Sequence, residues 1–451
     1  DSLPDELYRD DKPDLPQVKE PQVVRHFHNL SRDSFGVDTG PYLLGSCTMK
    51  YNPKLNEDLA ALPGYLNSHP RQPLDQMEGW LELMGQLHDH LSTLTALPTV
   101  SLLPAAGAQG EWVALRAIGE YFEEQGETQR TDVLVPDTAH GTNPASASIA
   151  GFDVVEIESN NRGRVSLDDL RSKVNESTAA LMLTNPNTLG LFEEDILEIK
   201  EIVHDAGGRL YYDGANLNAL VGRIRPGSMG FDVVHMNLHK TFTTPHGAGG
   251  PGSGPVAFTD ELAPYRPVPR LTKNGSDWTI EESSDQSLGE IRSYYGNMGI
   301  LVRALGYIQR MGEKGLAQVS KDAVMASNYL FENMPEEFER VYEGPCKHEF
   351  VVTCDNLPVD AEDVAKRLID YGIHPPTIHW PVKNCLMIEP TETLSRNELD
   401  EILDAFDEIV QEAIDDPERF ENAPHTTRIS RPDEAEAARD PVLNWTDSAT
   451  S

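Results

Sequence analysis

The middle of the chain alternates between short runs of consecutive apolar residues and longer segments in which apolar residues recur every three or four positions. The short runs lie at 132–137, 153–158, 180–185, 209–214, 232–237 and 255–258. Apolar residues in succession predict strands that are buried on both faces, as in a parallel sheet. Before the fourth run, Ile196, Ile199 and Val203 have helical spacing, and Gly207 and Gly208 predict the end of that helix. This alternation predicts an α/β fold.

The composition and the hydrophobic pattern of the chain change toward both ends. These changes predict four parts: an extended arm (1–60), a large domain (61–311), a smaller α+β domain (312–425) and an acidic, apolar-poor tail that we expect to be disordered (426–451). A long apolar helix pattern near 289–311 closes the large domain, and apolar runs at 349–355 and 385–390 predict strands in the smaller one.

Acidic residues outnumber basic ones by 74 to 37, which gives a formal net charge of -37. Such a charge repels nucleic acids and anionic membranes, so we expect neither as a partner. The 37 basic residues are 13 lysines and 24 arginines. A lysine-poor, acid-rich surface favours a halophilic source, in which salt screens the repulsion between the acidic groups.

The four cysteines form no CxxC pair and have no zinc-site spacing. They are typical of reduced thiols in a cytoplasmic protein, and we expect no metal site. The chain has no basic and apolar signal segment, and no window approaches 18 uninterrupted apolar residues. We therefore expect a soluble protein inside the cell.

Polar side chains follow several of the predicted strands, and ligands bind at the strand ends of open α/β sheets. Asp213 ends the run at 209–214, Lys240 follows the run at 232–237, and His140 follows the run at 132–137. Taken singly, each has an ordinary explanation: a turn-forming aspartate, a surface lysine and a loop histidine.

A turn of small residues, Ala105 to Gly110, precedes a helix pattern with Trp112, Leu115, Ile118 and Phe122 on one face. The N–H groups at such a helix start can bind a phosphate, although small residues there are also common packing devices. Together the four features supply a phosphate site, a ring-stacking group, a carboxylate for a ring nitrogen and a reactive amine. Those groups meet the binding needs of pyridoxal 5'-phosphate.

Two other motifs match the residue types of known binding sites but not the secondary structure that those sites require. The run GAGGPG at 247–252 fits GxGxxG, but it contains Pro251 and precedes a strand rather than a helix. We expect it to allow a tight turn rather than to bind a dinucleotide. His235 and His239 have the spacing of a zinc-binding helix, yet they lie on a strand and its exit, without the glutamate of that motif.

Several long motifs, in order, resemble the glycine decarboxylase P-protein of the glycine cleavage system. They are AHGTNPASASIAGF, LTNPNTLGLFE, YYDGANLNALVG, MNLHKTFTTPHGAGGPGSGP and MIEPTETLSRNELD, and the resemblance covers about residues 40–410. It implies the type I fold of pyridoxal-phosphate enzymes, with a mainly parallel seven-stranded sheet in the large, cofactor-binding domain and a smaller C-terminal α+β domain.

The resemblance also implies a role for individual residues. Lys240 matches the Schiff-base lysine, Asp213 the partner of the pyridine nitrogen, and His140 the ring-stacking histidine. The remaining cofactor-binding positions are the phosphate loop with a possible added histidine (Ala106, Gly107, Ala108 and His239), Ala215 in YDGAN, and Asn185 or Asn187 for the phenolic oxygen, of which Asn185 is preferred.

The family occurs either as one fused chain of about twice this length or as two subunits, of which the second carries the lysine. At 451 residues the chain resembles that second subunit. The resemblance implies a two-plus-two heterotetramer with the first subunit. It also implies that glycine is decarboxylated and its aminomethyl group passed to the lipoyl arm of H-protein. The alternatives are another type I decarboxylase or aminotransferase, and a noncatalytic partner subunit, which the Lys240 and Asp213 pair argues against.

Overall fold

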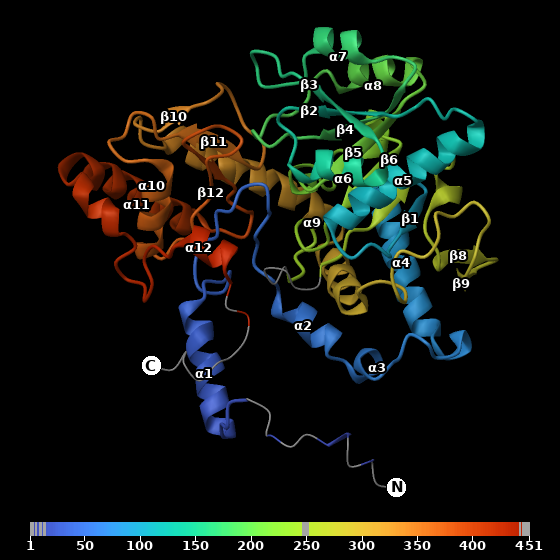
Figure 1. The fold of residues 1–451 in the computed structure, drawn as a ribbon, viewed down its shortest axis with the longest axis horizontal. Helices are drawn as coiled ribbons and strands as arrows, with labels where there is room; N and C mark the ends of the chain where they lie inside the picture. Colours follow the sequence, from blue (N-terminus) through green and yellow to red (C-terminus); the bar gives the residue numbers. More distant parts are fainter. Residues whose placement is uncertain are drawn as a thin grey trace.

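The computed structural model describes residues 15–245 and 252–441, together with residues 4, 7, 8, 11 and 443. Figure 1 shows a large body built on the longest sheet, a smaller body beside it and the long helix α9 (Met298–Asn333) running between the two. The glycine-rich segment 247–252, predicted to turn tightly, lies outside the described residues except for Gly252.

The large body contains a seven-stranded sheet with the strand order β1-β7-β6-β5-β4-β2-β3. The strands are β1 (Thr99–Ser101), β2 (Asp132–Pro136), β3 (Asp153–Ile157), β4 (Thr178–Thr184), β5 (Arg209–Gly214), β6 (Val233–Met236) and β7 (Val256–Phe258). Neighbours from β3 to β6 pair in parallel, whereas β7 is antiparallel to both β6 and β1. The carboxyl ends of β2, β4, β5 and β6 therefore lie at one edge of the sheet.

Helices cover both faces of this sheet, because successive strand residues point to opposite sides. Val133 and Val135 pack with α5 (Gly107–Gln125) and α6 (Thr142–Ala150). Leu134 belongs to the core on the other face, formed by α4 (Glu78–Thr95), α8 (Ile196–Asp205) and the first part of α9. Short α7 (Leu167–Lys173) packs against α8 and β3.

The predicted large-domain strands are confirmed, with bounds that differ by one or two residues. The helix at Ile196 is confirmed as well, since all three spaced residues are buried and Gly207 follows it with φ of 83°. Strand β1 was not predicted; with three residues, it is too short to give a periodic signal.

The helix predicted near 289–311 is wrong at its start and at its end. Gly289, Tyr294 and Gly296 have positive φ, which a right-handed helix does not allow, so the helix begins only at Met298. It then continues through the predicted domain boundary to Asn333, with a single break at Gly312.

The smaller body has its own core, sheet and capped helices. Its antiparallel sheet has the strand order β10-β11-β13-β12. The strands are β10 (Glu339–Arg340), β11 (Phe350–Thr353), β12 (Thr377–Ile378) and β13 (Cys385–Ile388). Helices α10 (Ala361–Asp370) and α11 (Arg396–Asp415) begin at capping boxes led by Asp360 and Ser395. The strands predicted at 349–355 and 385–390 are thus confirmed.

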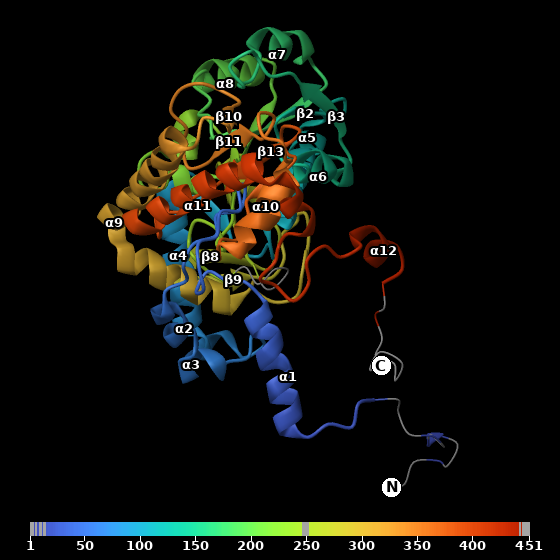
Figure 2. The same ribbon diagram turned by 90° about the vertical axis from the view of Figure 1, so that its left-hand side faces the viewer.

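The N-terminal arm was predicted to be extended, but it contains two helices, α1 (Glu20–Asp33) and α2 (Lys54–Ala60). Between them the chain lies against the smaller body, where Leu43 joins the core and Leu44 forms a β-bridge with Ile388. Helix α1 projects away from both bodies (Figure 2). Short α3 (Pro63–Leu66) follows α2, and α12 (Glu434–Arg439) lies in the segment predicted to be a disordered tail.

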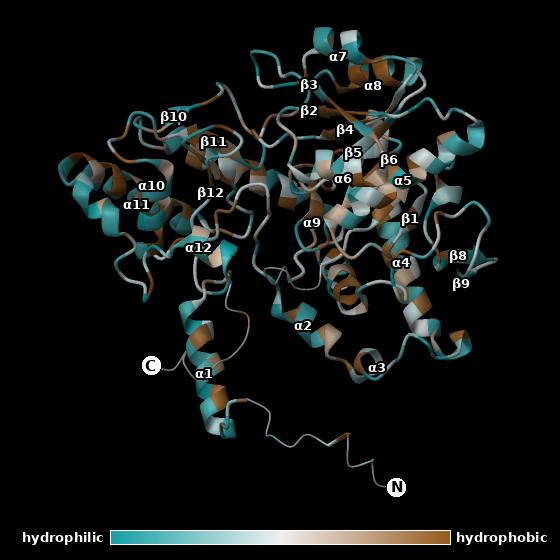
Figure 3. Cartoon of the chain, viewed as in Figure 1, coloured by the Kyte–Doolittle hydropathy of each residue, from teal (hydrophilic) through white to brown (hydrophobic). Residues whose placement is uncertain are grey.

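Two further hairpin strands, β8 (Arg270–Asn274) and β9 (Asp277–Glu281), pack near α4. Apolar residues concentrate in the central strands and on the inward sides of the helices, and the outer helix faces are hydrophilic (Figure 3). No helix in the described part of the chain has the length and apolar character needed to cross a membrane.

Candidate active site

Asp213 lies at the carboxyl end of β5 with its side chain almost fully buried. Its Oδ2 accepts a hydrogen bond from Asn143 Nδ2 at 3.0 Å, and its Oδ1 accepts one from the backbone N–H of Ala215 at 2.9 Å. Burial raises the pKa of this carboxyl, but His235, Asn143 and Ala215 outweigh it, so the net shift of the pKa is downward. Asp213 is therefore a buried anion prepared to face a cation.

His235 on β6 is a member of this site that the sequence analysis had considered only as half of a zinc pair. Its Nε2 lies 3.5 Å from Asp213 Oδ1. Its Nδ1 lies 2.5 Å from the hydroxyl of Tyr211, with the two rings nearly parallel. The other half of the pair, His239, instead accepts a hydrogen bond from the backbone N–H of Ser253.

Lys240 follows β6 and is half-buried beside Asp213. Its Nζ donates a hydrogen bond of 2.8 Å to the backbone carbonyl of Ser46. The N-terminal arm thus reaches the lysine across 194 positions of sequence. No local pattern in the sequence predicts such a contact.

The small-residue turn forms the start of α5, as predicted. Ala106 is its N-cap, Gly107 its first residue, and the first turn carries no acidic side chain. A Cβ on Gly107 would lie 2.6 Å from Oδ1 of Asn237, which is itself buried without a hydrogen-bond partner among the described residues. The backbone N–H groups of the first turn, including that of Ala108, form a positive helix terminus next to β6.

His140 and Asn185 occupy different settings. His140 is exposed, with Nδ1 2.9 Å from Thr142 Oγ1 and its ring edge-on to Trp380 of the smaller body, 5.7 Å between centroids. Asn185 is fully buried, and its Oδ1 accepts a hydrogen bond of 2.9 Å from the N–H of Glu193. This hydrogen bond fixes the chain that follows β4. A contact of Asn185 with a cofactor stays a prediction.

Three buried side chains of the smaller body lie near the lysine: His348, Glu349 and Glu389. Glu349 Oε2 accepts a hydrogen bond of 2.7 Å from the N–H of Ser46, the residue that also binds Lys240. These residues were missed, although Glu389 follows an apolar strand as Asp213 does. The rule that found Asp213 would have found Glu389 had it been applied to the smaller domain.

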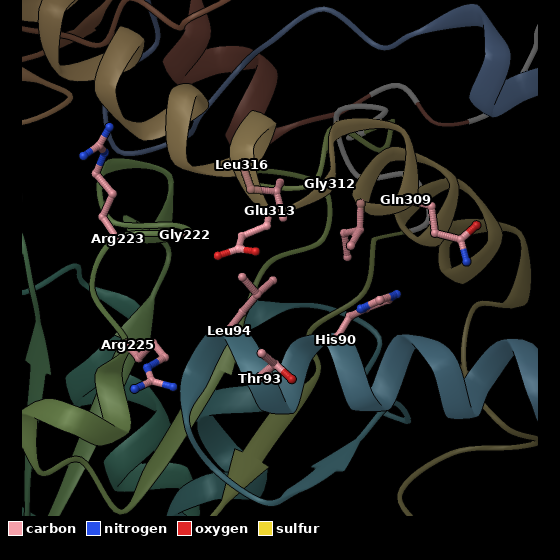
Figure 4. Close-up of a pocket in the computed structure, with 11 residues that line it drawn as sticks. His90, Thr93, Leu94, Gly222, Arg223, Arg225, Gln309, Gly312, Glu313 and Leu316 are labelled. Atoms are coloured by element: carbon pink, nitrogen blue, oxygen red, sulfur yellow. The ribbon is translucent and has the colours of Figure 1, made fainter.

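Two clefts differ in their relation to these residues. A cleft of about 430 Å³ lies between the arm and the segment after β6, and is lined by Thr48, Lys50, Asn52 and His239 among others. A larger pocket of about 720 Å³ lies between α4, α9 and the loop at 222–225 (Figure 4). It contains none of the predicted site residues, whereas the first cleft is lined by one of them, His239.

The fold and this site define a class of protein: the type I fold of pyridoxal-phosphate enzymes. The crystal structure of a glycine decarboxylase (P-protein) of the glycine cleavage system, in inhibitor-bound form, aligns with a TM-score of 0.77 at 21% identity and covers 90% of this chain and 93% of that one. A sphingosine-1-phosphate lyase from Burkholderia pseudomallei aligns with a TM-score of 0.64 at 15% identity, covering 90% and 94%.

Sequence relatives identify the family within that class. A protein of Halalkalibacterium halodurans, named probable glycine dehydrogenase (decarboxylating) subunit 2, is 54% identical over 98% of this chain and 92% of its own length. A Staphylococcus aureus protein of the same name is 53% identical over 98% and 91%. Residues 319–427 match the model of the glycine dehydrogenase C-terminal domain. The chain belongs to the family of glycine dehydrogenase (decarboxylating) subunit 2, which confirms the expected family, fold and enzyme class.

Proposed function

We propose that the chain binds pyridoxal 5'-phosphate and, with a first subunit, decarboxylates glycine and passes the aminomethyl group to the lipoyl arm of H-protein. The observation that carries this proposal is the buried Asp213 carboxylate beside Lys240 at one sheet edge. A protonated pyridine nitrogen needs such an anion, and an aldehyde needs such an amine. The inhibitor-bound P-protein, which shares the fold, supports the same assignment.

The residues present fit the cofactor. His235 Nε2 and Asn237 Oδ1 are buried polar atoms with no hydrogen-bond partner among the described residues. Gly107 leaves the space that a Cβ would fill next to both side chains. Buried polar atoms usually have partners, and a phosphate bound at the start of α5 would accept a hydrogen bond from His235 Nε2.

Each residue has one task in this proposal. Lys240 holds the cofactor through its amine, and Asp213 keeps a proton on the ring nitrogen. The N–H groups of Gly107 and Ala108 bind the phosphate, and His140 covers the ring face. Ala106 and His239 add to the phosphate site, and Asn185 contacts the phenolic oxygen of the cofactor. Ala215 is a further cofactor contact. When bound, the cofactor supplies a ring that accepts the electron pair left when CO2 departs.

The proposed partners rest on the family name and on the N-terminal arm. The relatives are named subunit 2, and we infer a first subunit in a two-plus-two heterotetramer, at work in the cytoplasm. Helix α1 has no buried residue, and its Val24 and Phe27 are 60% and 63% exposed. An apolar helix face that projects from the body is suited to pack on that subunit.

The test combines a spectrum with an exchange assay. The chain, co-expressed with a first subunit, is supplied with pyridoxal phosphate and scanned for a visible absorbance band. It is then assayed for H-protein-dependent exchange of labelled bicarbonate into glycine. We expect both signals in the wild type and in Lys54→Ala, which removes an exposed lysine, and neither signal in Lys240→Ala.

Three results would contradict the proposal. Protein that stays colourless with the cofactor would exclude pyridoxal chemistry and favour a noncatalytic subunit. A band that survives Lys240→Ala would move the covalent contact to another amine. Exchange with alanine or glutamate in place of glycine would favour a different type I enzyme.

A further inference from the structure

His348, Glu349 and Glu389 form a buried cluster at the start of β11 and the end of β13, with side chains no more than 1% exposed. His348 Nε2 lies 3.7 Å from Glu349 Oε1 and 3.8 Å from Glu389 Oε1. These distances are too long for hydrogen bonds, yet the three groups lie within 4.8 Å of one another. Two carboxyl groups therefore share one small buried space.

The hydrogen bonds to the two carboxyl groups are unequal and incomplete. Glu349 accepts from the Ser46 N–H at 2.7 Å and from Asn216 Nδ2 at 3.1 Å. Glu389 Oε1 accepts from Thr48 Oγ1 at 2.6 Å. Among the described residues, Glu389 Oε2 and both ring nitrogens of His348 have no partner. Three donors cannot stabilise two buried negative charges placed side by side.

The charged groups around the pair leave one positive charge facing it. Lys240 interacts with both glutamates, and its Nζ is linked to Glu349 through the Ser46 peptide. Lys50 also acts on Glu389, but it is already paired with Glu392 at 2.7 Å. The neighbouring Cys47 is uncharged, because burial raises the pKa of its thiol. One ammonium group is thus available to balance the pair.

The direction of each pKa shift agrees with a single positive charge facing the two carboxyl groups. Burial raises the pKa of Glu389 to about 7, and burial together with the Glu389 charge raises the pKa of Glu349 as well. Burial and the nearby Lys240 lower the pKa of His348 to about 3, so its ring is neutral at physiological pH. The two carboxyl groups titrate as a unit.

We propose that Glu349 and Glu389 share one proton and present a single negative charge to the Lys240 amine. They are positioning residues, since they act through the amine. When the ammonium gives up a proton, an N–H bond breaks and an O–H bond forms on the pair, by way of solvent in the site. The charge of amine plus pair is zero before and after this transfer.

The proposal depends on the proposed function only for the importance of the amine, and its test needs no cofactor. The chain in complex with a first subunit is freed of cofactor and labelled with trace acetic anhydride between pH 6 and 11. The labelled fraction of Lys240 is read by peptide mass spectrometry, with exposed Lys54 as internal reference. The variants are Glu349→Gln, Glu389→Gln and the double variant, with Glu193→Gln as a buried control elsewhere.

A shared proton predicts a non-additive result. In either single variant the remaining glutamate loses its like-charged neighbour and ionises, so one negative charge remains and the labelling midpoint of Lys240 stays within about 0.3 pH unit. The double variant removes that charge and lowers the midpoint by about 1 pH unit or more. Glu193→Gln leaves the midpoint unchanged. Equal, additive shifts in the single variants would overturn the proposal, as would no shift in the double variant.

A second measurement on the wild-type complex covers variants that fail to fold. At neutral pH its infrared spectrum is expected to show a protonated carboxyl band that shifts on deuteration. A spectrum without that band would overturn the proposal. So would a stoichiometric transition metal retained after dialysis, because a metal held by the same three side chains would replace the shared proton. A wild-type protein that stays colourless with the cofactor would contradict the proposed function and leave the shared proton untouched.

Discussion

At the scale of single residues, the proposed chemistry depends most directly on the carboxylate of Asp213. Two hydrogen bonds and the neighbouring His235 keep it ionised although its side chain is almost fully buried. A fixed charge in such a site is worth far more than one in water. The position of Asp213 at the end of a buried strand made it predictable, because few other places in a sheet deliver a polar group to a ligand.

Asp213→Asn keeps the shape of the side chain and removes its charge. We expect glycine exchange to fall by about 10²–10³-fold, the usual loss when one preorganised electrostatic group is removed. The absorbance band should persist, since Lys240 remains. Asp137→Asn, a change at an exposed residue near the same sheet edge, is the control and should retain full exchange. Equal activity of Asp213→Asn and wild type would refute the assignment.

His348 gives a prediction for stability against pH. Its pKa is about 3 in the folded chain, lowered by burial and by Lys240, against 6.5 for an ordinary histidine. Between these values the unfolded chain binds the additional proton, so the stability contribution falls as pH falls. Relative to His348→Gln, the wild type should lose about 1.4 kcal/mol of unfolding free energy per pH unit below 6.5. Urea unfolding of both proteins at pH 7 and pH 5.5 measures this; parallel curves would contradict it.

At the scale of elements, α9 and the arm join the two bodies. Helix α9 contributes Ile308 to the core of the large body and Leu330 to the core of the smaller one. The break at Gly312 falls between them, with φ of 62° and ψ of -178°. Only glycine adopts that conformation readily. The direction in which the helix enters the smaller body therefore depends on one residue.

Gly312→Ala tests this dependence. No atom lies within 4 Å of a Cβ built on Gly312, so the substitution acts through the backbone alone. We expect it to destabilise the chain by about 1–3 kcal/mol. The matched control is Gly299→Ala in the same helix, where a Cβ would lie 3.0 Å from Arg303 Nη1, the end of a flexible side chain that can shift, so the change should be close to neutral. Thermal unfolding distinguishes the two, and a Gly312→Ala protein as stable as the wild type would show that the break is not required.

The exposed face of α1 predicts a binding defect. Val24→Ser with Phe27→Ser removes apolar area from a helix that buries none of its residues in this chain. If α1 packs on the first subunit, the dissociation constant should rise about tenfold or more. Leu197→Ser, which changes an equally exposed leucine on α8, should not alter binding. Unchanged affinity of the α1 variant, measured by sedimentation, would place the interface elsewhere.

At the scale of the whole molecule, the sequence predicted what depends on local order and missed what depends on distant contacts. Apolar runs located the strands of the large sheet because burial on both faces is recorded in consecutive residues. The contact of Ser46 with Glu349 joins residues 303 positions apart, and no local pattern encodes it. The hydrogen bond of Asn185 Oδ1 with the Glu193 N–H is one that the motif did not indicate, and the cofactor contact of Asn185 stays a prediction. Helical breaks at positive φ were likewise invisible to periodicity.

The net charge of -37 gives a prediction for the molecule as a whole. Repulsion among exposed carboxylates destabilises the compact state at low ionic strength, and salt screens it as the Debye length falls from about 10 Å at 0.1 M to about 3 Å at 1 M. We therefore expect Tm to rise by about 5 °C or more between 0.05 and 1 M KCl. Screening should then level off, whereas preferential exclusion of salt would continue to raise Tm above 1 M. Equal concentrations of NaCl should match KCl, and a Tm that stays constant or falls with salt would contradict the inferred adaptation.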